Sequence, residues 1–429
     1  MNLRNVRRIY LDHASATPIH PVAQRTIAQF SARYANPGAL HAEAVEAKHA
    51  LERARERIAA HLGSKAREII FTSGLTEGNA LAIVGAARAL ERTRRTLQGT
   101  HWLTSDIEHS SVLESFAEVE RMGGRVTHIP PDKHGRIQPE RVASLLSQET
   151  VFVSVGWANN ELGVVQPLSR IARVLRAYEK KHAAGRPRSA MPRIQLHSDA
   201  GQGPIYLSPN VHTLGVDLFS VGSGKLYGPR GVGCLYVGTK ATIAPIHFGG
   251  GQQRGLRPGT EDPILAAGFM SAFDQIARSR AAESHRAAKL RDELAKQIGV
   301  LYPQAVLNGD LQRSLPHMLN VSFPGEQTGE YLALRFDRLG VALSTKSTCR
   351  EGEAASHVVE ALEKAASTTS VKLSVGAPAG AATTASTFRP WRAQNTLRFS
   401  LGPTTTAADL KYVVAALQRI IPTVPTPKR

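Results

Sequence analysis

The sequence predicts an α/β protein, with a mostly parallel sheet of seven strands in a large domain and a small α+β domain beside it. Two observations predict this class. Short apolar runs alternate with segments of helical periodicity between residues 41 and 237. The pattern changes after about Pro263, where a long helical segment begins. Strands that alternate with helices require right-handed crossovers, which place helices on both faces of a parallel sheet.

The first strongly periodic segment is His41–Leu62, which we expect to form a helix that stops at Gly63. The apolar runs after it are the candidate strands: Glu68–Thr72, Trp102–Thr104, Arg125–Ile129, Val151–Val155, Ile194–His197, Leu218–Val221 and Val232–Val237. Helical patterns lie between several of these runs: Asn79–Arg92, Ser111–Met122 and Leu168–Lys181.

A second unit is predicted after Pro263. Its expected elements are a long helix at Ile264–Ile298, strands at Met318–Phe323 and Leu397–Leu401, and a last helix at Thr406–Ile421. Ala, Ser, Thr and Gly dominate Ala365–Thr387, which we interpret as a flexible surface insertion. Pro422–Arg429 is expected to be a frayed tail.

Composition and charge argue against a nucleic-acid-binding, a secreted or a membrane-spanning protein. The net charge is +18, but Lys and Arg are dispersed, and the densest patches lack interleaved aromatics. We therefore do not expect nucleic acid as the main ligand, and a basic surface instead attracts anionic substrates or an acidic partner. The two cysteines, Cys234 and Cys349, favour a reducing compartment. No apolar run suits a signal peptide or a membrane span, so we expect a cytoplasmic protein.

Polar loops follow five of the predicted strands. They are Ser73–Asn79, Glu108–Ser111, Asn159–Gly163, Asp199–Gln202 and Gly222–Lys225. Ligands of open α/β sheets bind at the carboxyl ends of the strands. The sequence therefore predicts that these five loops converge on one site.

Lys225 is the first candidate for chemistry in that site. A Walker A loop would need Gly at position 219 and Ser or Thr at 226, but Phe219 and Leu226 stand there. A lysine next to glycines in a strand-end loop can instead form a Schiff base, because glycine admits a bulky cofactor and partial desolvation depresses the pKa of the amine. Taken alone, the residue fits a surface lysine better.

Three further motifs have two interpretations each. Asp199 would keep a pyridine nitrogen protonated, or it caps a helix. Thr72–Glu77 joins a strand to a helix, where free N–H groups and the Thr76 hydroxyl would bind a phosphate, or it is a simple capping turn. His109 would stack on a ring or move protons, or it is one of the sixteen histidines with a structural role.

The second half of the chain adds three candidates. Cys349 lies beside Lys346 and Arg350, which favour the nucleophilic thiolate, whereas the alternative is an incidental exposed thiol. Arg398 stands inside an apolar strand, where a substrate carboxylate or an internal salt bridge would pair it. The glycine-rich, cationic loop Gly249–Thr260 would reach an anion or would simply connect the two units.

In this order, these segments resemble the cysteine desulfurase family, in the class V aminotransferase branch of the pyridoxal-phosphate enzymes. The motifs that carry the resemblance cover nearly the whole chain: Tyr10–Pro18, Asn36-Pro37, Phe71–Asn79, Glu108-His109, Asn159–Gly163, Asp199–Gln202, Lys225–Pro229, Gly249–Thr260, Asn308–Asp310, Cys349 and Leu397–Gly402. The resemblance outweighs the structural interpretation of each separate motif.

The resemblance implies a fold type I transferase that works as a homodimer. Residues 19–263 would form the large cofactor domain. Residues 1–18 and 264–429 would form the small domain, with a mobile cysteine loop at 344–355 and the insertion at 365–387.

It also implies a role for each site residue. Lys225 would hold pyridoxal 5'-phosphate and move the Cα proton of L-cysteine, while Cys349 would attack the substrate sulfur and become a persulfide. The resemblance also implies that His109 would stack on the ring and transfer protons, that Asp199 would pair with the pyridine nitrogen, and that Gln202 and Asn160 would contact the ring oxygen or the substrate. Leu75 and Thr76 would bind the phosphate, and Thr260 would bind the phosphate in the other subunit. Arg398 would bind the substrate carboxylate. A scaffold protein for iron–sulfur clusters, or another acceptor, would then receive the sulfur.

Two departures from the family pattern stand out. Gly222 and Gly224 occupy positions where the family has a Ser and a His that contact the phosphate, so we expect weaker retention of the cofactor, with Ser223 as one substitute hydroxyl. Lys346 is bulky where small residues are usual. The alternatives left open are a selenocysteine lyase or another enzyme of the same branch, and a cofactor-poor sulfur-relay or scaffold protein.

Overall fold

The computed structural model describes residues 8–32, 34–183, 193–346, 355–374 and 389–421. Its larger part is built on a seven-stranded sheet with the order β2-β8-β7-β6-β5-β3-β4. The strands are β2 (Ile69–Thr72), β3 (His101–Ser105), β4 (Arg125–Ile129), β5 (Thr150–Ser154), β6 (Gln195–Asp199), β7 (Leu218–Gly222) and β8 (Gly233–Val237). Among these strands, β8 runs antiparallel to both of its neighbours, β2 and β7, and the other neighbouring strands pair in parallel. The predicted fold class is confirmed.

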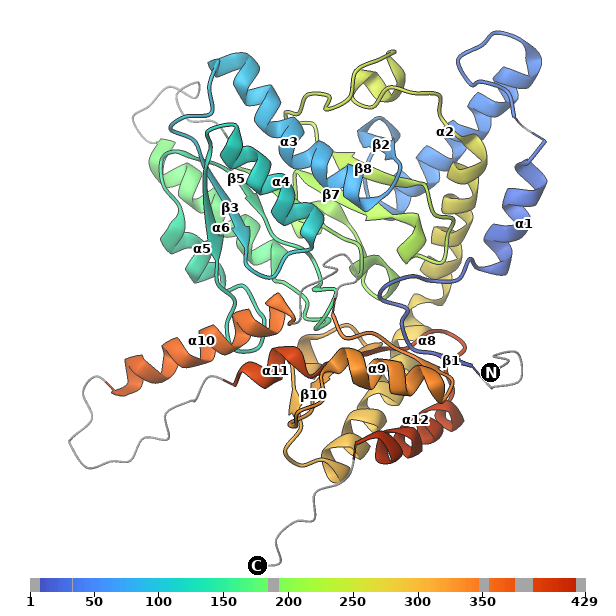
Figure 1. Ribbon diagram of the computed structural model, residues 1–429. Coiled ribbons are helices and arrows are strands. Elements are labelled where there is room, and N and C mark those ends of the chain that lie inside the picture. The colour runs from blue at the N-terminus through green and yellow to red at the C-terminus, as the bar shows by residue number, and fades with distance from the viewer. Residues whose placement is uncertain (1–7, 33, 184–192, 347–354, 375–388, 422–429) are drawn as a thin grey trace, which may run out of the picture.

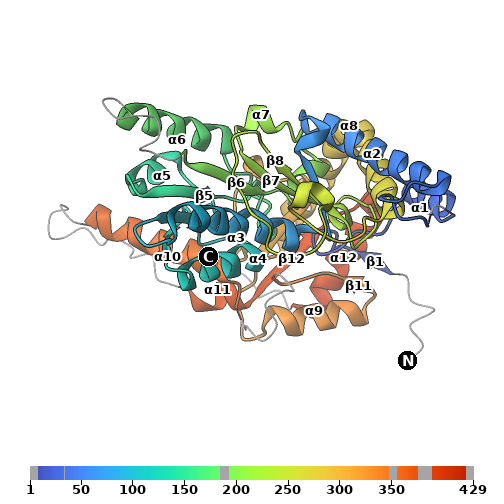
Figure 2. The same ribbon diagram turned by 90° about the horizontal axis from the view of Figure 1, so that it is seen from above.

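Helices cover both faces of this sheet because successive strand residues point to opposite sides. In β5, Phe152 packs into the core under α3 (Leu75–Arg94) and α4 (Ser110–Arg121). Its neighbour Val153 packs into the core on the other face. The helices on that second face are α2 (Ala42–Leu62), α5 (Pro139–Leu145), α6 (Leu168–Ala183), α7 (Val211–Leu214) and the first half of α8 (Pro263–Leu301), and α1 (Pro21–Phe30) packs beside α8. The sheet and its two helical layers are visible from two directions in Figures 1 and 2.

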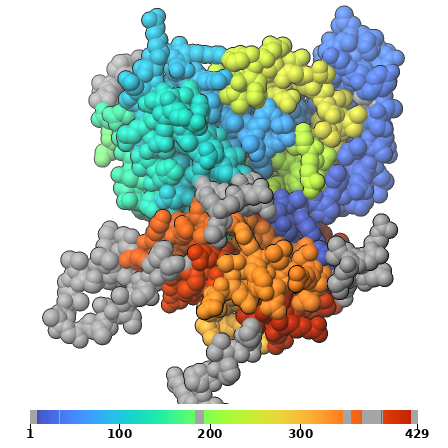
Figure 3. Space-filling model, viewed as in Figure 1, coloured from blue at the N-terminus to red at the C-terminus, as the bar shows by residue number. Residues whose placement is uncertain are grey.

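A smaller unit lies below the large one in Figure 1 and against its lower edge in Figure 3. Its antiparallel sheet has the order β12-β10-β9, and its helices pack on this sheet with the second half of α8. The elements are β9 (Val306–Leu307), β10 (Met318–Ser322), α9 (Gly329–Arg338), β11 (Val341–Ala342), α11 (Pro390–Gln394), β12 (Thr396–Ser400) and α12 (Ala407–Ile420).

The beginning of the chain joins this smaller unit. The strand β1 (Ile9–Tyr10) pairs in parallel with β11, and Ile9 and Leu11 are buried in the small core. Asp12 then forms a bridge to Ser400 of β12. Residues 12–16 are thereby held along the seam between the two units, next to the strand that carries Arg398.

The division at residues 18 and 263 stays a prediction. Packing does not follow it everywhere, because Phe269 and Phe273 of α8 and Val358 of α10 (His357–Ser374) belong to the large core. Residues 365–374, which are part of the proposed flexible insertion, continue helix α10, and the flexibility of the insertion stays a prediction. Residues 375–387, Pro422–Arg429 and the predicted cysteine loop from 347 to 354 lie outside the described residues. Within the described residues, no helix is long and apolar enough to cross a membrane.

Candidate active site

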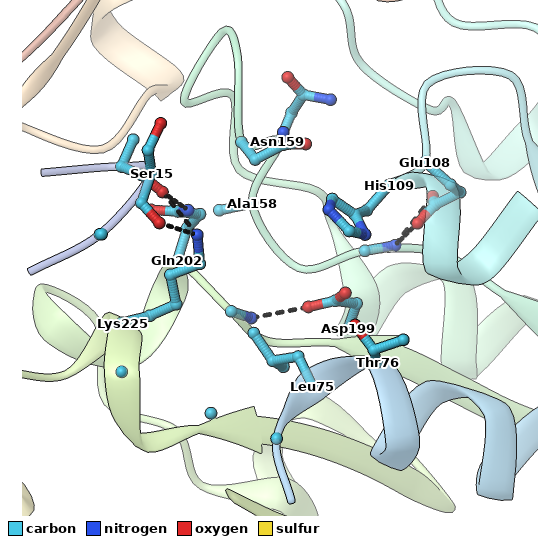
Figure 4. Close-up of a pocket in the computed structure, with 18 of the residues that line it drawn as sticks. Ser15, Leu75, Thr76, Glu108, His109, Ala158, Asn159, Asp199, Gln202 and Lys225 are labelled. Carbon is cyan, nitrogen blue, oxygen red and sulfur yellow. Dashed lines mark hydrogen bonds between the residues drawn. The ribbon is translucent and has the colours of Figure 1, made fainter. Parts of the chain in front are cut away.

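A cavity of about 330 Å³ opens at the carboxyl ends of the parallel strands. Four of the five predicted loops contribute side chains that Figure 4 labels: Leu75, His109, Asn159 and Asp199. The fifth loop supplies Lys225, and the small unit supplies Ser15 and Arg398. Parallel strands place their ends at one edge, so the predicted convergence of these loops is what the structure shows.

Asp199 is held by two donors at the end of β6. Its Oδ1 accepts from the backbone N–H of Gly201 at 2.8 Å, and its Oδ2 accepts from Asn79 Nδ2 at 2.6 Å. Asn79 is fully buried on α3, and its amide also donates to Ser111 Oγ at 2.9 Å. A carboxylate with two fixed donors stays oriented toward the cavity.

His109 is the next member of this chain of contacts. It caps α4, and its Nδ1 accepts from the backbone N–H of Ser111 at 3.1 Å and lies 2.8 Å from Ser111 Oγ. An Nδ1 that accepts a backbone hydrogen bond places the ring proton on Nε2. Burial lowers the pKa of His109, against the opposing effect of the Asp199 charge, so the ring is neutral near pH 7. We call Asp199, Asn79, Ser111 and His109 the polar network.

Sequence reasoning assigned no role to Asn79, Ser111 or Glu108. Glu108 is buried and accepts from Ser105 Oγ at 2.5 Å and from the backbone N–H of Gly156 at 3.0 Å. Burial raises the pKa of Glu108 to about 7. The one signal in the sequence was their place in the strand-end loops. Most of their hydrogen-bond partners lie in other loops, far away in the sequence, so the sequence did not indicate these contacts.

Lys225 ends a single turn of 3-10 helix after β7. Its Nζ donates to the backbone oxygens of Ala14 at 2.9 Å and Ser15 at 2.5 Å. Gln202 Nε2 donates to the same oxygen of Ala14 at 2.8 Å. Gln202 Oε1 is buried and has no hydrogen-bond partner in the described part of the chain. This acceptor therefore awaits a donor in the cavity.

Arg398 lines the cavity from β12 and is almost completely buried, with 1% of its surface exposed. Its Nη2 donates to Asp12 Oδ1 at 2.8 Å and to Ser15 Oγ, and its Nη1 donates to the backbone oxygen of Asn160 at 2.8 Å. Its Nε lacks a partner among the described residues. The internal salt bridge, one of the two predicted interpretations, is thus present, while the binding of a substrate carboxylate by Arg398 stays a prediction.

Glycines and Leu75 form much of the opposite side of the cavity, next to Ser73, Thr76 and Arg230. Leu75 opens α3, and its first backbone N–H groups have no helical partner, as at any helix start. Leu75 fills the space that side chains at Gly201 and Gly222 would need, because a Cβ at these positions would lie 2.8 and 2.7 Å from it. We call Gly74, Leu75, Gly201, Gly222 and Gly224 the glycine end of the cavity.

Not every predicted residue reaches the cavity. Leu75, Thr76, His109, Asn160, Asp199, Gln202, Gly222, Lys225 and Arg398 line it. Ser223 does not line it. Its hydroxyl is fully buried beside Gly228, so closely that a Cβ built at position 228 would lie 2.1 Å from Ser223 Oγ. Thr260 is exposed and does not line the cavity of its own chain. Cys349 lies outside the described residues.

These residues fit a cofactor with an aromatic ring and an anionic end. The polar network offers a fixed carboxylate and a neutral imidazole, and Gln202 offers an unused acceptor. The start of α3 offers free N–H groups and Thr76 to an anion. Lys225 brings an amine to the same cavity. We find no described group of three or more His, Cys, Asp or Glu that would hold a metal ion instead.

The chain is similar to known proteins over most of its length. Cysteine desulfurase IscS of Dictyoglomus turgidum is 33% identical over 417 residues, which cover 97% of this chain and 95% of that protein. Putative cysteine desulfurase IscS 1 of Bacillus subtilis is 36% identical over 379 residues, which cover 86% and 94%. A solved NifS-like protein matches with a TM-score of 0.82 at 28% identity and covers 96% of this chain and 99% of its own.

A family pattern extends over the same length. The pattern of the class V aminotransferases matches residues 9–413, which include every described residue of the cavity. The predicted resemblance is confirmed, and so is the cofactor that it implies. The chain belongs to the class V aminotransferase family, whose members use pyridoxal phosphate.

Proposed function

We propose that this protein is a cysteine desulfurase that converts L-cysteine to L-alanine and keeps the sulfur as a persulfide on Cys349. The observation that carries the proposal is that an amine and a guanidinium line one cavity, and that the residues on both sides of the Cys349 segment contact residues of its wall. Lys225 and Arg398 are the first two of these, and an α-amino acid presents an amine and a carboxylate on the same carbon.

The structure describes the residues that precede and follow the segment around Cys349. Ser344 pairs with Arg398 through two backbone hydrogen bonds of 2.6 and 3.4 Å. Ser356 Oγ donates to Glu161 Oε2 at 2.5 Å, and His357 Nε2 lies 3.1 Å from the backbone oxygen of Glu108. Cys349 stands five residues after Ser344 and seven before Ser356, so it lies within at most about 17 Å of the first and about 24 Å of the second.

Each residue of the cavity has a task in this reaction. Lys225 would hold the cofactor covalently through Nζ, Asp199 would face the ring nitrogen, and Thr76 with the start of α3 would bind the phosphate. When bound, pyridoxal phosphate supplies a protonated ring that accepts the electron pair of a substrate bond. Arg398 binds the substrate carboxylate. The Lys225 amine takes the Cα proton, and His109, with its proton on Nε2, acts first as a donor.

The sulfur transfer balances without an added oxidant. The Cys349 thiolate attacks the substrate sulfur, a sulfur–sulfur bond forms, and the carbon–sulfur bond breaks. The electron pair of the broken bond stays with the substrate carbon, which takes up a proton to become the methyl group of alanine, and Lys225 returns a proton to Cα. The persulfide then passes to an acceptor, which we propose to be a scaffold protein for iron–sulfur clusters.

The assembly is part of the proposal. Thr260 is exposed and does not line its own cavity, which suits a residue that binds the phosphate in the partner subunit of a homodimer. The two cysteines of the chain suit a cytoplasmic location.

Release of alanine from L-cysteine by the purified protein with added pyridoxal phosphate tests the function, with Cys349→Ala beside it. We expect alanine and a protein-bound persulfide from the wild type and neither from the variant. Alanine from both proteins would show that Cys349 is not the nucleophile. Alanine from neither would favour another amino acid substrate, such as selenocysteine, or a sulfur-relay role.

A further inference from the structure

Residues 12–16 connect the two groups that would recognise an amino acid. Ser15 contacts both of them, because its backbone oxygen accepts from Lys225 Nζ and its Oγ accepts from Arg398 Nη2. The Ser15 hydroxyl also donates to Asp12 Oδ1 at 2.8 Å. One short segment therefore fixes the amine and the guanidinium relative to each other.

Asp12 is the charged member of this segment. Its carboxylate lies 2.8 Å from Arg398 Nη2, and 18% of its side-chain surface is exposed. Ser15 and Arg398 line the cavity, whereas Asp12 lies behind them. A substrate carboxylate bound to Arg398 would thus contact the same guanidinium as the Asp12 carboxylate, from the side of the cavity.

We propose that Asp12 is a specificity-determining residue that weakens the binding of α-carboxylates at Arg398. Without substrate, its charge compensates a buried guanidinium that would otherwise stand alone, which is costly. With substrate, the same charge repels the incoming carboxylate. Asp12 thereby favours release of the amino acid product. This inference rests on the proposed function, because it takes the ligand of Arg398 to be an amino acid.

Asp12→Asn tests the inference because it removes the charge and keeps an oxygen that accepts from Ser15 and Arg398. Calorimetry on the cofactor-loaded protein would compare L-alanine with ethylamine, which lacks the carboxylate. We expect L-alanine to bind Asp12→Asn about tenfold more tightly than wild type, as one unit charge a few ångströms away predicts at a partly buried site. Ethylamine should bind both proteins equally.

A matched control separates the effect from a general loss of charge. Asp337→Asn breaks an ion pair of the same type with Arg8, which is exposed and distant from the cavity, and should leave both affinities unchanged. If Asp12→Asn does not fold, the neutral and smaller Asp12→Ser tests the same charge. Equal or weaker binding of L-alanine by the neutral variant would overturn the inference. Wild type that binds neither ligand would instead overturn the proposed function, and the inference with it.

Discussion

The polar network and the glycine end lie in the same cavity but are built in opposite ways. In the polar network, each side chain is fixed by a neighbour, from Gly201 through Asp199 and Asn79 to Ser111 and His109. At the glycine end, an apolar side chain, Leu75, takes the space where other side chains could stand. The difference teaches that, with the cofactor bound as proposed, the polar network would be preorganised for its ring and the backbone of α3 would bind its phosphate.

The largest effect is expected at Lys225, whose amine lies in the same cavity as the polar network and the glycine end. Lys225→Ala should lower the turnover of L-cysteine by about ten-thousandfold, the upper end of the range for a positioned proton-transfer group. Alanine release under saturating cofactor measures it. Lys240→Ala, at an exposed lysine just after β8, is the matched control and should keep full activity. A loss of less than about tenfold would show that another group moves the proton.

The pH dependence of stability tests the burial of Glu108 beside the polar network. Burial raises its pKa from 4.5 to about 7, so the folded protein binds this proton more tightly than the unfolded chain does. The stability contributed by Glu108 is therefore present at low pH and falls as the pH rises toward 7. Relative to wild type, Glu108→Gln should gain about 3 kcal/mol in free energy of unfolding between pH 5 and pH 8. Denaturant titrations at both pH values measure this gain, and a pH-independent difference would contradict the assignment.

Asn79→Ala tests the polar network itself. The change removes a donor from both Asp199 and Ser111, and unsatisfied buried partners cost about 2 kcal/mol, or about thirtyfold in kcat. The KM for L-cysteine should stay unchanged, because Arg398 is untouched. Asn395→Ala removes another buried asparagine, which donates to Gly325 in the small unit, and should lower stability without this loss of kcat. An equal loss in both variants would make the role of Asn79 merely structural.

The smallest effect is expected at the glycine end. Gly222→Ser alone should not improve cofactor binding, because its Cβ would lie 2.7 Å from Leu75 Cγ. Leu75→Ala combined with Gly222→Ser should bind pyridoxal phosphate about fivefold more tightly than wild type, since one added hydrogen bond contributes about 1 kcal/mol. Equilibrium dialysis of the four proteins of this cycle measures the coupling. Wild type that keeps its cofactor through long dialysis would contradict the expected weak retention.

Sequence periodicity was enough to predict the sheet and the helices around it, because strand and helix patterns are local. It also predicted that Asp199, His109 and Lys225 meet, since strands joined by right-handed crossovers end at the same edge. It did not predict that residues 365–374 continue α10, because the Ser, Thr and Val residues of this stretch are weak helix formers.

Contacts between distant segments were decided only by the tertiary structure. The pairing of Arg398 with Asp12 joins residues 386 positions apart, and that of Asn79 with Asp199 joins residues 120 apart. The direction of Ser223, away from the cavity, depends on the packing of Gly228. The sequence by itself determined which residue types stand at the ends of the strands. Which of them touch, and which atom faces the ligand, was decided by side-chain packing between elements, which no local pattern encodes.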